Sequence, residues 1–139
     1  MQITRQADYA VRAIMYLAKL DPDEKAATSQ IATEQEIPLS FLAKIIAQLS
    51  VAGLLQTMRG ARGGVTLAKD PQDITLLEVV EAIDGPILLN DCVDDDYECP
   101  VDGCPIREVW RDIQNDLVYR LRTTTFGEYA HKKIRRGTD

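Results

Sequence analysis

The stretch from residue 28 to residue 67 most limits what this chain can fold into, because it predicts two short helices and a β-hairpin joined by tight turns. A short helix is expected to start near Thr28, and the chain then turns at Pro38. Ser40 is the expected N-cap residue of the next helix, which runs to about Ala52. Two short helices joined by a tight turn are typical of a helix-turn-helix DNA-binding unit.

The helix expected from Ser40 to Ala52 has one apolar face and one small, polar face. Its apolar side chains recur every three or four residues, which predicts a single buried stripe: Leu42, Ile45, Ile46 and Leu49. The opposite face carries Ser40, Ala43, Lys44, Ala47 and Gln48. This face would enter the major groove, with Lys44 and Gln48 as the main expected contacts to bases or phosphates. Ser40 on the same face and Thr28 at the start of the preceding helix are further expected DNA contacts. Phe41 lies outside the stripe, and two roles stay open for it: contact with a thymine methyl group or sugar, and packing against the first helix.

Two β-prone segments, 54–57 and 65–67, flank a glycine-rich stretch and predict a β-hairpin, the wing of a winged helix. Arg59 and Arg62 lie in that stretch, where an arginine can enter a narrow minor groove or hold a phosphate. A glycine-rich loop can also cradle a nucleotide, but this one lacks the Walker spacing and the helix that would follow it.

A long helix is expected after Pro105, with apolar residues spaced by threes and fours. This apolar seam consists of Ile106, Val109, Trp110, Ile113, Leu117 and Leu121. A lone helix cannot bury such a seam. Pairing with a second copy of the chain would cover it and would supply the two-fold symmetry of a palindromic DNA operator. The alternative is that the seam packs entirely within one chain.

The remaining segments complete a mainly α fold with a small β-hairpin wing. A first helix is expected from Thr4 to about Leu20, and Thr75 with Glu78 forms a capping box that opens a helix packed against the winged unit. We predict three parts: a winged helix-turn-helix DNA-binding domain at 1–84, a cysteine-containing loop at 85–104, and a dimerisation helix with a C-terminal tail at 105–139.

Cys92, Cys99 and Cys104 are the only cysteines, and they lie within thirteen residues. The sequence shows no membrane span and no signal peptide, so we expect a cytoplasmic protein, in which thiols stay reduced. Metal ligation or redox chemistry is therefore expected before disulfide formation. Zinc loops usually carry closely spaced Cys-x-x-Cys pairs, whereas six and four residues separate these cysteines. Zinc and unligated thiols stay open as alternatives.

The acidic residues gather around the cysteines. The chain carries a net charge of -6, yet residues 1–69 hold eight basic against six acidic side chains. Residues 84–112 hold nine acidic against two basic ones. Because charge acts locally, the acidity of the cysteine region does not exclude DNA contact by the first half of the chain.

Four features in order resemble the Rrf family of bacterial winged-helix transcription regulators, particularly its IscR-, NsrR- and RirA-like members. These features are the opening stretch 1–13, the helix start at 39–42, the wing at 59–64 and the three cysteines. The resemblance spans nearly the whole chain. It implies a dimeric DNA-binding protein whose cysteines hold an iron-sulfur cluster that changes DNA binding.

The resemblance also implies ligands for that cluster. Three thiolates leave one position for a weaker donor, which suits either a 2Fe-2S or a 4Fe-4S cluster. IscR-like members place a histidine three residues after the last cysteine, but this chain has Arg107 there, and its one histidine, His131, lies far along the chain. NsrR-like members use an aspartate from the other subunit, and Asp8 matches its position. Asp8 also reads as an acidic residue in the first turn of a helix, and Glu108 is a reserve ligand.

The function expected from these features is regulation of transcription, with repression the more usual outcome in the family. The signal would be cluster supply, iron, nitric oxide or redox stress, and genes of iron-sulfur cluster assembly are the expected targets. The alternative is a metal-free regulator that reads thiol oxidation directly. An enzyme is not expected, because no histidine lies near the cysteines in sequence and no Cys-x-x-Cys motif is present.

Overall fold

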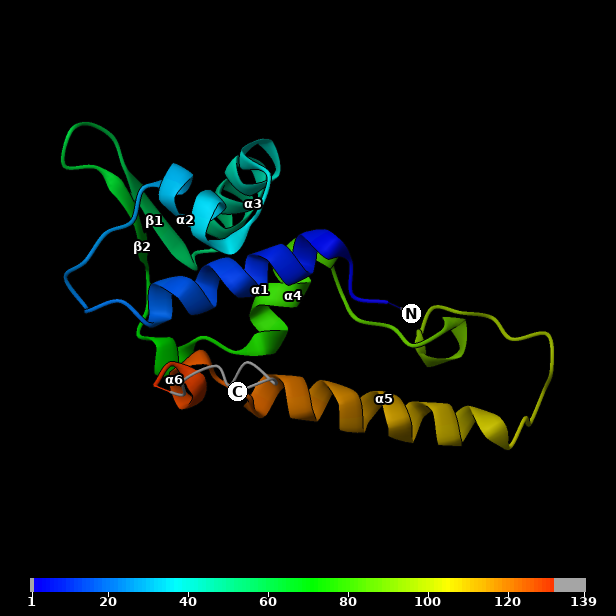
Figure 1. Ribbon diagram of the computed structural model, residues 1–139. Coiled ribbons are helices and arrows are strands. Elements are labelled where there is room, and N and C mark those ends of the chain that lie inside the picture. Colours follow the sequence, from blue (N-terminus) through cyan, green and yellow to red (C-terminus); the bar gives the residue numbers. More distant parts are fainter. Residues whose placement is uncertain (1, 132–139) are drawn as a thin grey trace, which may run out of the picture.

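The computed structural model describes residues 2–131, so the tail at 132–139 lies outside the described residues. Figure 1 shows a helical molecule with one small hairpin. The elements are α1 (Arg5–Ala18), α2 (Thr28–Gln35), α3 (Leu39–Val51), β1 (Leu55–Met58), β2 (Gly64–Leu67), the 3-10 turn η1 (Pro71–Asp73), α4 (Leu76–Asp84), the 3-10 turn η2 (Asp91–Val93), α5 (Ile106–Thr123) and α6 (Phe126–Tyr129). The expected mainly α fold with a β-hairpin is confirmed.

The turn between α2 and α3 differs in one detail from the expectation. Glu36 adopts a left-handed conformation with φ 53°, and the chain enters α3 through Pro38. Pro38, whose ring fixes φ, is the N-cap residue, and no side chain caps this end of the helix. The expectation that Ser40 is the N-cap residue was therefore wrong, because Ser40 already lies inside the first turn.

The apolar stripe of α3 is buried as expected. Leu42 and Leu49 are fully buried, and Ile45 and Ile46 are at most 5% exposed. They pack in the main core with buried residues from the other helices and the hairpin, including Ala10, Ile14, Leu17, Ile31, Val65, Ile74, Val79 and Phe126. Each fully buried Leu or Ile side chain contributes roughly 1.5–3 kcal/mol, so this core fixes the orientation of α3 on α1 and α4.

The hairpin is antiparallel, with Leu55 paired to Leu67 and Met58 to Gly64. A third segment supports it, because Ala26 exchanges two backbone hydrogen bonds with Val65, at 3.2 and 2.7 Å. Gly63 leaves no room for a Cβ against the carbonyl of Met58, so the turn itself requires glycine there. The hairpin is thus held along the outer edge of β2, close to the loop, and presents the loop away from the core.

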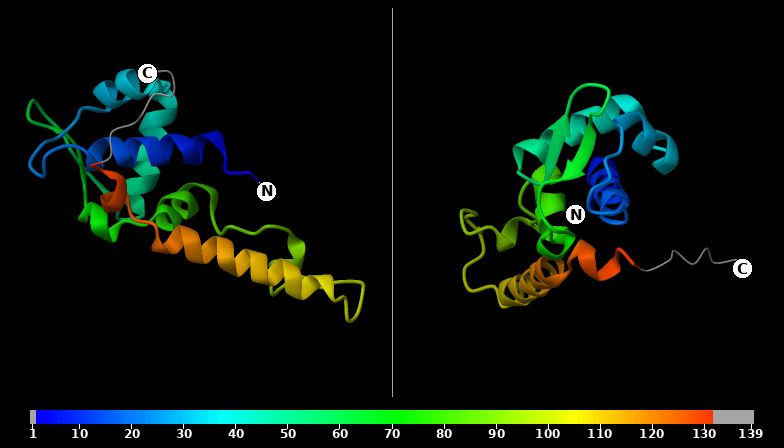
Figure 2. Two further views of the ribbon diagram at one scale, coloured as in Figure 1. Left: turned by 60° about the horizontal axis from the view of Figure 1, so that its bottom comes forward. Right: turned by 90° about the vertical axis from the view of Figure 1, so that its left-hand side faces the viewer.

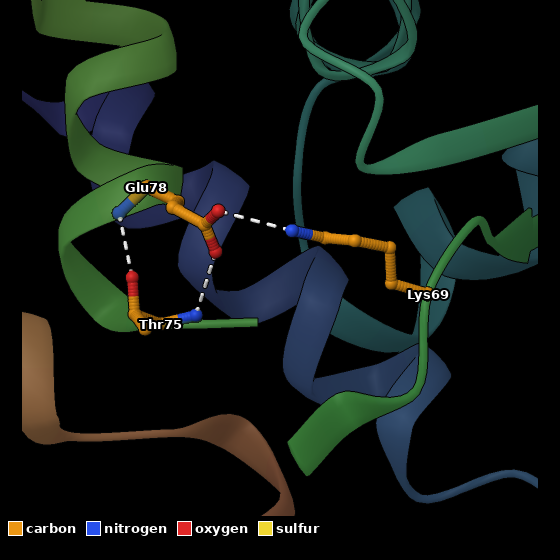
Figure 3. A network of polar contacts seen from close by, with 3 residues as sticks. All are labelled: Lys69, Thr75 and Glu78. Carbon is orange, nitrogen blue, oxygen red and sulfur yellow. Dashed lines mark hydrogen bonds and ion pairs between the residues drawn. The ribbon is translucent and has the colours of Figure 1, made fainter. Parts of the chain in front are cut away.

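The capping box at the start of α4 is present, and Figure 3 shows it with a third partner. The N–H of Glu78 donates to Thr75 Oγ1 at 3.1 Å, and the N–H of Thr75 donates to Glu78 Oε2 at 3.0 Å. Lys69 Nζ lies 3.0 Å from Glu78 Oε1. Partial burial raises the pKa of Glu78, but the Thr75 N–H and the Lys69 ammonium favour the carboxylate and outweigh burial. The pKa of Glu78 consequently lies below its ordinary value.

We expect Glu78→Gln to lower the free energy of unfolding at neutral pH and to lose that effect in acid. A carboxylate with a lowered pKa in the folded state stabilises the fold above its ordinary pKa of 4.5, and that contribution fades as pH falls through the lowered value. Urea unfolding at a series of pH values measures the difference between the two proteins. Glu81→Gln is the control, because Glu81 makes no ion pair within residues 2–131. A Glu78→Gln deficit of constant size down to the acid limit would contradict this assignment.

Helix α5 crosses the opposite side of the molecule from α3 and the wing loop, as Figures 1 and 2 show. Its C-terminal half is attached through Leu117 and Leu121, which pack on a small cluster formed by Ala7, Val80 and Ile87. These two members of the apolar seam therefore belong to the fold of one chain.

Candidate functional site

The outward face of α3 is the first part of the candidate site. Ser40 and Lys44 are exposed there, and Gln48 is half-buried. Phe41 is 46% exposed and lies outside the core clusters, so it is not a core residue. The burial of the apolar stripe on α1 and α4 turns this face outward. It offers an ammonium group, an amide, a hydroxyl and an aromatic edge to a partner.

The wing loop is the second part. Arg59 and Arg62 are both exposed, and Lys25 Nζ donates to the Arg62 carbonyl at 3.4 Å. Thr28, the first residue of α2, is half-buried. In Figures 1 and 2 the wing loop and α3 project from the same side of the molecule. The structure therefore brings the predicted DNA-contacting residues to one side.

The cysteine loop (residues 85–104) is the third part. Cys92 lies in η2, which packs on α5, and the rest of the loop leads outward before it returns to the start of α5 at Ile106 (Figure 1). All three cysteines are free thiols and half-buried. An exposed ion pair between Arg111 and Asp95, 3.4 Å apart, joins the middle of the loop to α5.

The structure does not gather the predicted ligands into one site. Within residues 2–131, no group of three or more His, Cys, Asp or Glu side chains is arranged to hold a metal ion. Glu108 is exposed in the first turn of α5. His131 is exposed and lines a pocket of about 650 Å³ at the end of α1, which no cysteine lines. For the three cysteines to bind one metal centre, the cysteine loop would have to change conformation and bring them together.

Asp8 is engaged by Arg12, which the sequence analysis missed. Asp8 Oδ2 forms an ion pair with Arg12 Nε at 3.3 Å, and within residues 2–131 the Nε–H makes no hydrogen bond. Arg12 Nη1 also donates to the Gln35 carbonyl at 2.9 Å, and its guanidinium lies 4.8 Å from the centre of the Tyr9 ring. Arg12 thus connects Asp8 to the C-terminus of α2. The spacing of four residues between opposite charges is the signal that could have found it.

The N-terminus of α1 is tied to the start of the cysteine loop. Thr4 Oγ1 donates to Asp84 Oδ1 at 2.5 Å, and the N–H of Thr4 donates to Asp84 Oδ2 at 3.2 Å. Residues 2–4 and 84–88 line a shallow pocket of about 250 Å³. The first helix, which carries Asp8, and the loop therefore meet within one chain.

The N-terminal half of the apolar seam on α5 is exposed. Ile106 is 52% exposed, Val109 50%, Trp110 38% and Ile113 44%. Among residues 2–131 nothing covers this half, so the alternative, that the seam packs entirely within one chain, fails there. The exposed half forms one stripe along the helix, and a second stripe of half-buried or buried residues faces the cysteine loop and α4: Arg107, Arg111, Gln114 and Val118. With about 3.6 residues per turn, the two stripes are separated by roughly a third of a turn.

No helix in the part of the chain that the structure describes is long and apolar enough to cross a membrane.

Comparisons with known proteins agree with this arrangement. A family model named Rrf2 and described as an iron-dependent transcriptional regulator matches residues 3–132. Protein aau3 of Rhizobium meliloti is 34% identical over 130 residues, which cover 92% of this chain and 84% of that protein. The HTH-type transcriptional regulator NsrR of Bacillus subtilis is 35% identical over 94 residues, 68% of this chain and 64% of that protein. The solved structure of CymR, the global cysteine regulator of Bacillus subtilis, is similar with a TM-score of 0.82 and 26% identity, covering 96% of this chain and 99% of that one.

Proposed function

The chain belongs to the Rrf2 family of transcriptional regulators, and from that premise we propose that it is a homodimeric repressor that senses iron through a cluster held by its three cysteines. The family consists of DNA-binding regulators rather than enzymes. The observation that carries the proposal is the presence of three free, half-buried thiols on one loop, packed on the helix that also exposes an apolar face.

The chemistry of the donors supports an iron-sulfur cluster. Thiolates are soft ligands, and Cys92, Cys99 and Cys104 are free for ligation. Two buried polar atoms near the loop, Asn90 Oδ1 and Arg107 Nε, have no hydrogen-bond partner. Such unpaired atoms are costly, and a rearranged loop would offer them partners. A bound cluster would respond to changes in iron availability and to oxidants.

Asp8 of the partner subunit is the proposed fourth ligand, with Glu108 as the reserve. In the described chain Asp8 is 61% exposed at its side chain, so a second subunit can reach it. Ligation would draw the carboxylate away from Arg12, whose other contact is the last carbonyl of α2. This geometry links ligation to the helix-turn-helix.

We expect Asp8→Ala to release iron roughly tenfold faster or more under chelator challenge, because a ligand contributes at least as much as the outer partners of a metal site. Glu108→Ala is the matched variant, since it removes the reserve carboxylate. Iron release, followed by absorbance on anaerobically loaded protein, distinguishes the two residues. Faster release from Glu108→Ala alone would transfer the ligand role to Glu108.

For DNA binding we propose that residues 1–84 act as the reading unit. In a dimer the two α3 helices would enter successive major grooves, and the wings would reach the flanking minor grooves. A palindromic operator follows from the two-fold symmetry. Selection of bound duplexes from a random pool, with iron-loaded and iron-free protein, tests this directly. Recovery of inverted repeats from only one of the two forms is the expected result, and sequence-independent recovery from both would contradict it.

If Lys44 reads a base, Lys44→Ala should weaken operator binding by about 1–3 kcal/mol. If Lys44 contacts a phosphate, the substitution should reduce the slope of log affinity against log salt concentration by about one. Lys44 is exposed on the outward face of α3, so its loss does not disturb the core. Fluorescence anisotropy at several salt concentrations measures both quantities. Arg120→Ala removes one exposed charge from α5 and should leave both unchanged. An unchanged affinity and salt slope for Lys44→Ala would exclude this role.

A second candidate is a regulator that reads thiol oxidation without metal. The likeness to CymR over nearly the whole chain supports it, as does the lack of a gathered metal-binding group within residues 2–131. In that case the half-buried thiols would be oxidised to sulfenic acid or to a disulfide. A colourless protein whose operator affinity responds to peroxide but not to iron would favour this candidate.

A further inference from the structure

The start of the cysteine loop is fixed to α5 by one buried amide. Gln114 is 9% exposed, the one buried polar residue among residues 2–131. Its Nε2 donates to the Ile87 carbonyl, and its Oε1 accepts from the N–H of Leu89 at 2.9 Å. Both ends of one side chain thus pair with the backbone just before Cys92.

This pairing is specific because it satisfies two backbone groups on alternate residues. Ile87 is 6% exposed and packs with Leu117 and Leu121, so its surroundings exclude most water. A buried carbonyl or N–H that loses its partner costs more than the net worth of a hydrogen bond. Removing the amide therefore leaves two backbone groups unpaired and weakens the attachment of residues 87–89 to α5, even if an apolar side chain fills the same space.

Beyond Leu89 the loop is held less firmly. The Arg111–Asp95 ion pair is exposed, with 94% of the Asp95 side chain open to solvent, and exposed pairs contribute little. Asn90 Oδ1 and Arg107 Nε are buried without partners. Within residues 2–131 the side-chain hydrogen bonds between loop and α5 that are shielded from solvent therefore end at Leu89, and beyond it η2 stays on α5 by packing.

We propose that Gln114 is a positioning residue for the cysteine loop, which it fixes on α5 so that Cys92 stays half-buried against that helix. The inference rests on the proposed function only in treating the loop as the sensor. The two hydrogen bonds of Gln114 would act in the same way whether the loop holds a cluster or bare thiols. The exposed apolar stripe lies on the same helix, roughly a third of a turn away. Gln114 thus joins the loop to the element that we expect to pair two chains.

The test uses three variants of the full chain. Gln114→Met keeps the length and nearly the volume of the side chain but loses both hydrogen bonds. Gln114→Glu keeps an acceptor for the N–H of Leu89. Asn115→Met is the matched control, because it replaces the neighbouring, exposed amide. Two rates are measured by mass spectrometry on reduced, metal-free protein without DNA: amide exchange at Leu89 and maleimide labelling of Cys92.

In Gln114→Met we expect both rates to rise about tenfold or more, as the loss of buried hydrogen bonds implies. Gln114→Glu should keep the Leu89 amide protected while Cys92 labels faster, and Asn115→Met should behave as wild type. A role in packing alone predicts wild-type rates for Gln114→Met, and rates within twofold of wild type would overturn the proposal. If Gln114→Met fails to fold, Gln114→Glu decides, and wild-type labelling of its Cys92 would overturn the proposal. Because neither metal nor DNA is present, failure of the sensing function leaves these results unchanged.

Discussion

Ile113→Glu should convert the proposed dimer to a monomer and lower affinity for a full operator by about 10²- to 10⁴-fold, the range that linked binding of two sites supplies. Ile113 lies in the exposed apolar stripe of α5 and is 44% exposed, so the monomer does not need it for its core. A glutamate there would leave an unpaired charge buried at the interface between two chains. The expected loss is large because each monomer would hold only half of the operator.

Light scattering gives the mass, and fluorescence anisotropy gives the affinity for full and half operators. Asn115→Glu adds the same charge on another face of α5 and should stay dimeric with unchanged affinity. A dimeric Ile113→Glu protein would place the interface elsewhere. A monomeric protein with wild-type affinity would show that the two chains are not linked through DNA.

Cys99→Ser should abolish the response of DNA binding to iron. Regulatory coupling between two sites is typically about 1–3 kcal/mol, which corresponds to roughly a 5- to 150-fold change in operator affinity, and we expect that ratio to fall to about one. A serine hydroxyl is a poor ligand for iron in a cluster, whereas soft thiolates are preferred. Because Cys99 is in the loop and outside the cores, the fold of the winged unit should be unaffected.

The comparison requires affinities of both iron-loaded and iron-depleted protein, measured without oxygen. Val101→Ser is the control, because it changes an exposed residue of the same loop that carries no ligand atom, and it should keep the wild-type ratio. If Cys99→Ser still gains and loses affinity with iron, the loop does not hold the sensor. If wild-type protein responds to peroxide but not to iron, and Cys99→Ser loses the peroxide response, the result would support the metal-free thiol mechanism.

The fold was predictable where local patterns and packing agree. The spacing of Leu42, Ile45 and Leu49 predicted the buried face of α3, and Thr75 with Glu78 predicted the start of α4. The prediction that Ser40 is the N-cap residue was wrong because it rested on residue type alone. The chain already turns into the helix at Pro38, two residues earlier. The seam on α5 divides into a packed half and an exposed half because only its C-terminal half reaches the cluster around Ile87.

The site was predictable in its residue types but not in its contacts. The cysteines indicate soft-ligand or redox chemistry, yet their spacing does not fix how the loop arranges them. Gln114 could not be singled out, because its partners Ile87 and Leu89 are separated from it by 27 and 25 residues and both use backbone atoms. Arg12 is the exception, since its distance of four residues from Asp8 is a local signal.

The most direct test of the central claim is an absorption spectrum, with iron and sulfide analysis, of protein purified without oxygen. We predict a brown protein that contains both elements and loses its colour when Cys92, Cys99 or Cys104 is replaced. The ratio of iron to protein would separate a 2Fe-2S from a 4Fe-4S cluster. A colourless protein without iron that also resists reconstitution would contradict the cluster and leave a DNA-binding regulator that senses by zinc or bare thiols.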